Sequence, residues 1–215
     1  MYELHDYLRS AAAYRVRIAL ALKGIEHARS DVDLVGGAQH DPEFRALNPQ
    51  GLVPVYSDEN LHLTQSLAII EYLDERYPEP PLLPTSLEQR ARARQMAQII
   101  CSDIHPLNGF RVHVYLRDAL GIDTVRRRRW FEHWMLEGLD ALELWLTAGG
   151  TTRRFAVGDT VSIADVCLVP QLDLARRNRI DVEDFPRLAA IEGACMSMPA
   201  FRDTHPGTGM GAATR

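Results

Sequence analysis

Residues 9–24 read RSAAAYRVRIALALKG, and this stretch decides how the first part of the chain folds. An apolar-rich segment begins after Ser10 and stops at Gly24, which is typical of a helix that starts at a serine and is closed by a glycine. Residues 2–7 alternate weakly between polar and apolar side chains, as in a strand. The stretch and its flank therefore predict a strand, a turn and a helix.

The next fifty residues continue the same alternation of strands and helices. Val32 and Leu34 alternate with aspartates, and Asp41-Pro42 combines a helix cap with a proline at the first helical position. The expected elements are a strand over 31–34, a helix over 42–47, strands over 53–56 and 61–63, and a helix over 66–76. This order predicts an α/β domain.

Residues 78–84 read PEPPLLP, a stiff connector that marks a domain boundary. We expect a first domain over residues 1–80, a linker over 81–87 and a second domain over 88–215. Beyond the connector every long segment has helical periodicity. The expected helices span 87–116, which follows a capping box of Ser86 and Gln89, then 125–146, 163–177, which follows a second box of Ser162 and Asp165, and 186–196. The second domain is therefore expected to be all-helical.

Composition excludes several classes of function. The chain has 215 residues with 24 basic and 29 acidic side chains, so its net charge is −5. Proteins that bind nucleic acid instead carry an excess of positive charge on the binding surface. The basic run Arg126 to Arg129 is interpreted as a solvated helix face. Glu3 and Asp6 stand where a signal peptide carries positive charge, and no apolar stretch approaches the roughly 18 residues of a membrane span. We expect a cytoplasmic protein that binds neither nucleic acid nor membrane.

The three cysteines are odd in number and widely spaced. They contain no CxxC motif, so neither a disulfide framework nor a zinc site is indicated, and no metal is expected. Cys101, Cys167 and Cys195 are each interpreted as small buried hydrophobes.

Two helix starts are candidate anion sites. Ser10 precedes a helix whose first N–H groups, those of Ala11, Ala12 and Ala13, favour a negative charge, and Gln65-Ser66 opens another. Pro54 interrupts an expected strand, which leaves two possibilities. Either it lies on a bare sheet edge, or a cis bond turns the Val53 backbone toward an extended ligand. Together these features suggest a small anionic peptide as ligand.

The chain resembles the zeta-class glutathione transferases, which include the maleylacetoacetate isomerases and the bacterial maleylpyruvate isomerases. The resemblance covers nearly the whole chain in order. It rests on residues 9–24, LNPQ at 47–50, LVP at 52–54, QSLAIIEYL at 65–73, LLP at 82–84, IHPLN at 104–108, VGD at 157–159, AD at 164–165, LVPQ at 168–171 and AF at 200–201. It implies a thioredoxin-like N-terminal domain, an all-α C-terminal domain, a homodimer, and glutathione as cofactor.

The resemblance also implies roles for single residues. Ser10 faces the glutathione sulfur at the helix start formed by Ala11 and Ala12, and Val53 beside a cis Pro54 pairs with the cysteinyl backbone. Further glutathione contacts are implied for His40, Gln50, Gln65, Ser66, His105 and Asn108. Arg9, Arg111 and Arg177 receive the carboxylates of a dicarboxylic substrate, and Ser10, Arg9 and Arg177 are the catalytic candidates.

Two departures from the family pattern keep the function open. Ala11, Ala12 and Ala13 replace side chains that often assist near the sulfur, and Gly109-Phe110 is less polar than in relatives. The first hypothesis is a glutathione-dependent isomerase of maleylacetoacetate or maleylpyruvate. A transferase or isomerase for a bulkier electrophile and a glutathione-binding module with impaired catalysis are the alternatives.

Overall fold

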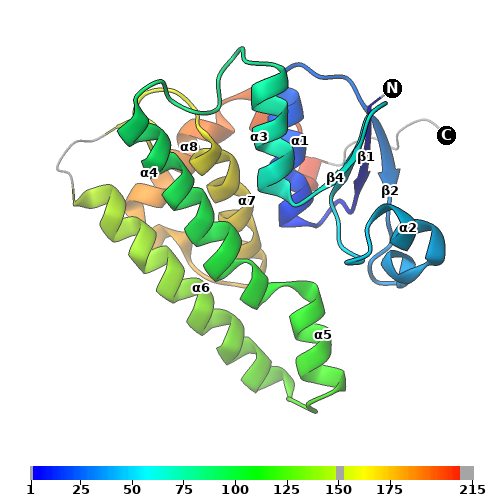
Figure 1. The fold of residues 1–215 in the computed structure, drawn as a ribbon. Coiled ribbons are helices and arrows are strands. Elements are labelled where there is room, and N and C mark those ends of the chain that lie inside the picture. The colour runs from blue at the N-terminus through cyan, green and yellow to red at the C-terminus, as the bar shows by residue number, and fades with distance from the viewer. Residues whose placement is uncertain (1, 149–152, 209–215) are drawn as a thin grey trace. The chain divides into compact units, whose positions relative to one another are not determined.

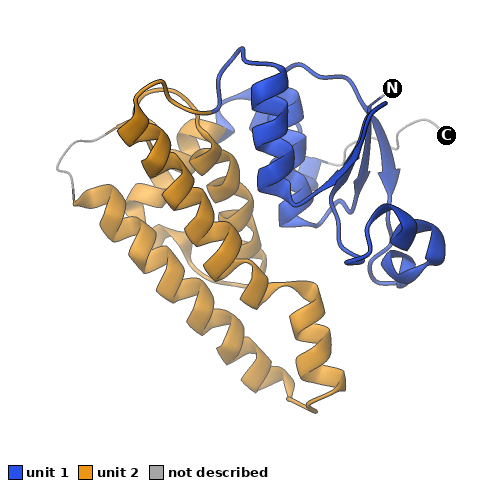
Figure 2. Cartoon of the chain, viewed as in Figure 1, with its two compact units in different colours: residues 1–82, 196–215 blue, residues 83–195 orange. Residues whose placement is uncertain are grey.

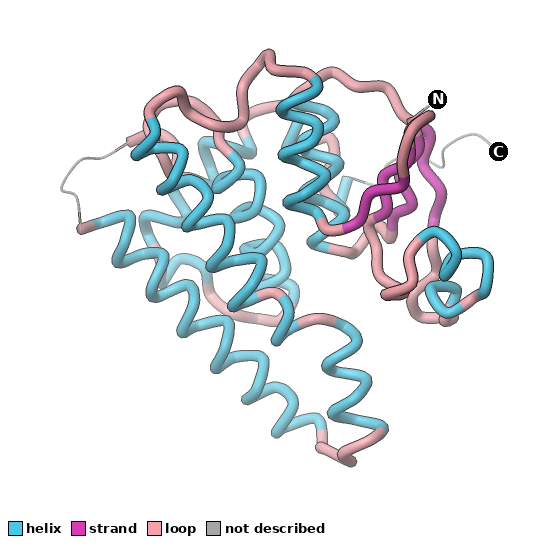
Figure 3. Tube along the Cα trace, in the orientation of Figure 1, coloured by secondary structure: helices cyan, strands magenta, loops and turns pink. Residues whose placement is uncertain are grey.

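The computed structural model describes residues 2–148 and 153–208. Contacts divide the chain into two compact units (Figure 2). The first comprises the described parts of Met1–Leu82 and Met196–Arg215, and the second comprises Leu83–Cys195. All named strands belong to the first unit, whereas helices make up most of the second (Figure 3). The segment from Met196 onward groups with the first unit, and the domain limits given above stay a prediction.

The first unit is built on a four-stranded sheet in the order β2-β1-β3-β4. Its strands are β1 (Glu3–Asp6), β2 (Ala28–Asp31), β3 (Val55–Ser57) and β4 (His62–Thr64). β1 and β2 are parallel because a helix connects them, while β3 runs antiparallel to both β1 and β4. In the turn between β3 and β4, Asp58 Oδ1 accepts hydrogen bonds from the N–H groups of Asn60 and Leu61.

Helices α1 (Ala11–Leu22) and α3 (Ser66–Arg76) pack against each other beside the sheet, while the short helix α2 (Pro42–Leu47) lies apart from them (Figure 1). Along α1 every residue from Ala13 to Leu20 is buried. The C-terminal helix α9 (Pro199–Arg202) also packs on α1, and the Tyr14 hydroxyl donates to the Phe201 carbonyl at 2.8 Å. The helix encoded by the opening stretch is thus the centre of this unit.

A buried ion pair joins the first strand to this helix. Asp6, at the end of β1, and Arg17, in the middle of α1, are 0% and 1% exposed. Arg17 Nη1 donates to both carboxylate oxygens at 2.7 Å, and Arg29 Nε lies 2.8 Å from one of them. Burial lowers the pKa of Arg17, and the Asp6 carboxylate opposes that shift. Arg17 also donates to the carbonyls of Leu8, at 3.0 Å, and Thr204, at 3.3 Å, so it holds the turn before Ser10 and the C-terminal segment.

The second unit is a helical bundle. Its elements are α4 (Leu87–Gln98), the π-helical segment η2 (Ile99–Ile104), the 3-10 turn η3 (Pro106–Asn108), α5 (Phe110–Asp118), α6 (Thr124–Thr147), α7 (Ile163–Arg177), the 3-10 turn η4 (Val182–Asp184) and α8 (Pro186–Met196). α7 is buried from Ile163 to Asp173 and packs on α4 and η2. The predicted box of Ser162 and Asp165 caps its start.

The structure corrects two predicted elements. The second strand lies at Ala28–Asp31 and not at 31–34, because the parallel register with β1 pairs Asp31 with Asp6 and ends there. The helix predicted over 87–116 is interrupted, because Pro106 has no N–H and its ring clashes with the carbonyl four residues earlier. The short elements η1 (Ala38–His40), η4, α9 and η5 (Pro206–Thr208) had no predicted counterpart. Within residues 2–148 and 153–208 no helix has the length and apolarity needed to cross a membrane.

Lys23, the only lysine in the sequence, joins the ends of α1 and α3. Its ammonium group lies 2.6 Å from Asp74 Oδ1, the Tyr77 carbonyl and the Pro80 carbonyl, and its side chain is fully covered. The three N–H groups of the ammonium therefore each have an acceptor.

We expect Lys23→Met to lower the free energy of unfolding by about 1.5–3 kcal/mol, because Asp74 loses a charge-assisted partner. Urea denaturation of the parent and the variant measures this difference. Arg126→Met is the matched control, since it removes one positive charge from an ion pair whose two side chains are 73% and 59% exposed. Equal stability changes in the two variants would contradict the assignment.

Candidate active site

The first candidate feature is the start of α1. Ser10 is the N-cap, and its Oγ accepts a hydrogen bond from the Ala13 N–H at 3.2 Å. The Ala13 N–H is therefore occupied, which corrects its inclusion among the anion donors. Among the described residues, no backbone hydrogen bond uses the N–H groups of Ala11 and Ala12. The Ser10 hydroxyl acts as acceptor in the cap, so its own hydrogen can be donated to a ligand.

The turn that carries Arg9 and Ser10 is fixed on both sides. Ser10 N–H donates to the Tyr7 carbonyl at 2.8 Å, and Arg17 holds the Leu8 carbonyl. The Arg9 side chain is exposed on this turn. A rigid backbone here sets where the Ser10 hydroxyl points, which a binding site on a loop requires.

The second feature is the segment before β3. The Val53–Pro54 bond is cis, as the resemblance implied, and Pro54 is buried. β3 pairs on both sides, so Pro54 is not on a bare sheet edge. The proline is tolerated because the strand begins after it, at Val55. Within the part of the chain that the structure describes, neither the N–H nor the C=O of Val53 takes part in a backbone hydrogen bond.

The third feature is the start of α3. Gln65 has φ 69° and ψ 112°, a conformation that L side chains rarely adopt. Such strain persists where the surroundings over-determine it, and it is concentrated at ligand sites. Gln65 Nε2 donates to Gln50 Oε1 at 2.9 Å, and the buried Arg15 donates to Ser66 Oγ at 3.3 Å. The contact of Arg15 with Ser66 links the α3 start to α1, four residues after Ala11. No glycine marks this position, so the sequence carried no signal of the strain.

The loop between η1 and β3 carries the remaining candidates of the first unit. Asn48 is buried, and its side chain accepts from the Gln50 N–H at 3.0 Å and donates to the Leu52 carbonyl at 2.7 Å. His40 is exposed, and its Nδ1 lies 3.3 Å from Arg45 Nη2. Gly51 has φ 62°, and a Cβ there would lie 2.9 Å from the Gln39 carbonyl oxygen. The sequence did not predict that Asn48 and Gly51 support this loop, although Asn48-Pro49 is a turn signal that can be read from the sequence.

The second unit holds four candidates. Asn108, at the end of η3, is 4% exposed, and neither polar atom of its side chain has a partner among the described residues. Buried polar groups are almost always paired, so this amide is suited to a ligand or a water molecule. His105, three residues earlier, is half-buried. Arg111 is exposed in the first turn of α5, and Arg177 Nε donates to Asp173 Oδ2 at 2.9 Å along α7.

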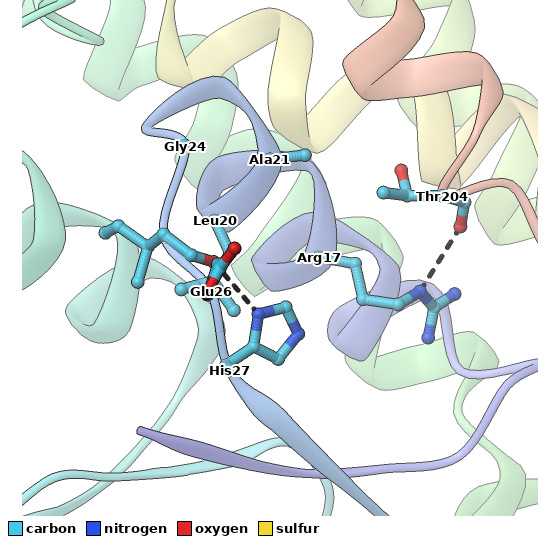
Figure 4. Close-up of a pocket in the computed structure, with 8 residues that line it drawn as sticks. Arg17, Leu20, Ala21, Gly24, Glu26, His27 and Thr204 are labelled. Carbon is cyan, nitrogen blue, oxygen red and sulfur yellow. Dashed lines mark hydrogen bonds between the residues drawn. The ribbon is translucent and has the colours of Figure 1, made fainter. Parts of the chain in front are cut away.

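A depression elsewhere on the first unit contains none of the candidates. It has a volume of about 630 Å³ and lies at the C-terminal half of α1, where Leu20, Glu26, His27 and Thr204 line it together with Arg17 (Figure 4). Arg17 donates to Thr204 there, and His27 contacts the Ile25 carbonyl at 3.1 Å. The guanidinium is already engaged by Asp6, so this depression offers little charge to an anion. Among residues 2–148 and 153–208 no cluster of three metal-ligating side chains occurs.

Comparison with known proteins identifies the class to which these features belong. Residues 4–81 match the N-terminal domain of glutathione S-transferases, and residues 135–199 match their C-terminal domain. The chain therefore belongs to the glutathione S-transferase family.

Several similar proteins within this family bear the names of isomerases. A probable maleylacetoacetate isomerase of Vibrio cholerae is 44% identical, and the match covers 94% of each chain. A maleylpyruvate isomerase of Ralstonia is 41% identical over 95% of this chain and 96% of that protein. The crystal structure of a maleylacetoacetate isomerase from Methylobacterium extorquens AM1, with bound malonate and glutathione, is 40% identical with a TM-score of 0.92 and covers 95% of this chain and 96% of that one. These matches confirm the resemblance and the fold class inferred from the sequence.

Proposed function

We propose that this chain is a glutathione-dependent cis–trans isomerase that converts maleylacetoacetate to fumarylacetoacetate, or maleylpyruvate to fumarylpyruvate, in the catabolism of aromatic compounds. The observation that carries the proposal is the start of α1, where the Ser10 hydroxyl can donate a hydrogen bond beside the N–H groups of Ala11 and Ala12. Relatives that match nearly the whole chain bear the names of these two isomerases.

The residues of the first unit fit a tripeptide with a carboxylate at each end. The Val53 N–H and C=O make no backbone hydrogen bond within the described residues, and their proposed role is to pair with the cysteinyl backbone of glutathione, as an added strand would. The helix start at Ser66, with the strained Gln65 before it, suits the α-carboxylate of the γ-glutamyl end. Gln50, held against Gln65, extends that contact, and His40 is the candidate for the glycyl carboxylate.

In the second unit Asn108 and His105 are the proposed cofactor contacts. The argument for Asn108 is its buried side-chain amide, which has both a donor and an acceptor without a partner among the described residues. A buried unpaired amide costs about 1–3 kcal/mol, and a peptide ligand removes that cost by pairing with both atoms. His105 lies at the end of the π-helical segment, and its backbone carbonyl accepts from the Asn108 N–H at 3.2 Å.

Bound glutathione supplies a thiolate that adds reversibly to the electron-poor cis double bond and so permits rotation about it. Ser10 and the helix start favour this thiolate over the thiol, because the hydroxyl donates to it and the positive end of the helix dipole lies beside it. Ala11 and Ala12 contribute backbone N–H groups only, since their side chains have no hydroxyl or thiol. Ser10 therefore carries most of the side-chain contribution.

The proposed role of arginine is to hold the carboxylates of the substrate. A planar guanidinium binds a carboxylate through two parallel hydrogen bonds, which fix orientation as well as charge. Arg9 directly precedes Ser10, and Arg111 lies in the first turn of α5. Arg177 is oriented by Asp173, whose Oδ2 lies 2.9 Å from Nε and 2.8 Å from Nη2. This pairing keeps the Arg177 side chain in one direction before substrate arrives.

The function is tested by incubating the purified chain with glutathione and each cis substrate while the products are followed by NMR. We expect formation of the trans product with no net loss of thiol. Net thiol loss would favour a transferase for another electrophile. Glutathione binding without turnover of either substrate would favour the impaired binding module.

We expect Ser10→Ala to lower isomerase turnover at saturating glutathione by about ten- to hundredfold, because one charge-assisted hydrogen bond is worth about 1.5–3 kcal/mol. Ser86→Ala is the matched control, since Ser86 caps α4 by the same contact, from the Gln89 N–H at 3.4 Å, and has no proposed catalytic role. Equal turnover of Ser10→Ala and the parent removes Ser10 from the mechanism.

We expect Arg9→Ala and Arg177→Ala to keep the affinity for glutathione and to lose at least about tenfold in kcat/KM for both substrates, because an arginine that holds the reacting anion acts on turnover as well as on binding. Arg177→Lys should restore part of the loss. Arg128→Ala is the control, since Arg128 forms the same kind of pair one helical turn apart with Glu132, at 2.6 Å. Isomerisation at the parent rate in both alanine variants contradicts the dicarboxylate proposal.

A homodimer is the proposed assembly. The described part of the second unit leaves large apolar side chains exposed, among them Leu87, Tyr115, Val125, Leu144 and Trp145. Exposed apolar surface of this kind is often covered by a second copy of the chain. We expect light scattering at micromolar concentration to give twice the chain mass of 24.2 kDa, and a result equal to one chain would count against the dimer.

A further inference from the structure

Two of the three cysteines meet inside the second unit. Cys101 lies in the π-helical segment η2, and Cys167 lies in α7. Their Sγ atoms are 3.7 Å apart, with the Cys101 thiol positioned as hydrogen-bond donor. The proposed isomerase chemistry uses neither thiol. We propose that this pair is a redox modification site, at which hydrogen peroxide closes an intrachain disulfide between Cys101 and Cys167.

The two thiols differ in exposure. Cys167 is fully buried, whereas Cys101 is only partly buried, which corrects its interpretation as a buried hydrophobe. Peroxide therefore reaches Cys101 first, and Cys167 is shielded from direct oxidation. A buried second thiol in contact with the first is the arrangement of a resolving cysteine, because it captures an oxidised partner before a second oxidant molecule arrives.

The chemistry is balanced in two steps. The Cys101 thiolate attacks one oxygen of hydrogen peroxide, the O–O bond breaks, and the products are a sulfenic acid and hydroxide. The Cys167 sulfur then attacks the Cys101 sulfur, and the S–O bond breaks as the S–S bond forms. The sulfenic oxygen leaves as water with the proton of the Cys167 thiol. One peroxide molecule thus oxidises two thiols to one disulfide.

Cys195 is excluded from the pair. It is fully buried in α8, and burial, together with the nearby negative charges of Asp165 and Glu192, raises its thiol pKa far above the usual range. The thiolate is the reactive form, so Cys195 stays reduced. It serves as an internal control within the same unit.

The disulfide would alter the segment that precedes the proposed cofactor contacts. A disulfide bond is about 2.05 Å long, so the two sulfur atoms must approach by about 1.6 Å from their separation of 3.7 Å. η2 is also closely fitted to α6, since a Cβ on Gly138 of α6 would lie 2.2 Å from Ile104 Cγ1. A displacement of η2 therefore reaches His105 and Asn108. Weaker glutathione binding by the oxidised chain is the expected consequence, and this consequence rests on the proposed function.

Peptide mapping tests the disulfide itself. Trypsin places the three cysteines on separate peptides, residues 95–111, 155–176 and 188–202. After peroxide treatment and non-reducing digestion, we expect peptides 95–111 and 155–176 to be linked and 188–202 to be free, with the link lost on adding dithiothreitol. Cys195→Ser should link as the parent does. Cys167→Ser should instead keep a sulfenic acid on Cys101, which dimedone labels.

The proposal is overturned if Cys101 is oxidised in the parent without forming the linked peptide, or if the link joins two chains or includes Cys195. Affinity for S-methylglutathione, which has no thiol to reduce the disulfide, tests the consequence by calorimetry. We expect it to fall at least fivefold on oxidation of the parent and to be unchanged by peroxide in Cys101→Ser. If the reduced parent fails to bind this probe, the proposed function fails while the mapped disulfide stands. An equal affinity of both forms would overturn the consequence alone.

Discussion

The ion pair between Asp6 and Arg17 is the constraint on which the geometry of the first unit depends. Both side chains are buried, so each needs the other to remain charged, and the guanidinium uses its further N–H groups on the Leu8 and Thr204 carbonyls. One side chain in the middle of α1 thereby fixes the end of β1, the turn that leads to Ser10, and the C-terminal segment. The start of α1 can then present a hydroxyl and two backbone N–H groups in a defined direction.

The backbone at the start of α3 is also fixed by side-chain contacts. Gln65 adopts a costly backbone conformation, and the contacts around it compensate for that cost: Gln50 accepts from its side chain, and Arg15 of α1 holds Ser66. Asn48 in turn holds the loop that carries Gln50 through one donor and one acceptor contact. The two helix starts are therefore supported in part by Arg15, Arg17 and Asn48, which are buried and have no proposed contact with a ligand.

In the second unit the interrupted helix positions the proposed cofactor contacts His105 and Asn108. Pro106 ends the regular hydrogen-bond pattern, and the chain before it widens into the π-helical segment from Ile99 to Ile104. Gly138 lets α6 approach Ile104 closely, and the Cys101 thiol meets α7 at Cys167. His105 and Asn108 thus follow a segment that packs on both α6 and α7, which is why the proposed disulfide is expected to affect the buried Asn108 amide.

Much of the architecture follows from local sequence. Helix limits marked by a cap or a proline agree with the structure within a residue or two, as for α2, α6, α7 and α8, because capping residues act on the backbone next to them. The second strand was misplaced because its position depends on pairing with β1, a partner distant in the chain. The helix over 87–116 was predicted as continuous because its apolar periodicity hid the effect of Pro106.

By itself the sequence determined the order of strands and helices, the helix start at Ser10, and, through its motifs, the family and its cofactor. Only the tertiary structure decided that Gln65 is strained, that Arg15 of α1 contacts Ser66 of α3 and that two cysteines 66 positions apart touch. The physical reason is the separation in sequence between the residues that interact. Caps and turns are set by neighbours in the chain, whereas strain, burial and side-chain pairing exist only after distant segments have packed together.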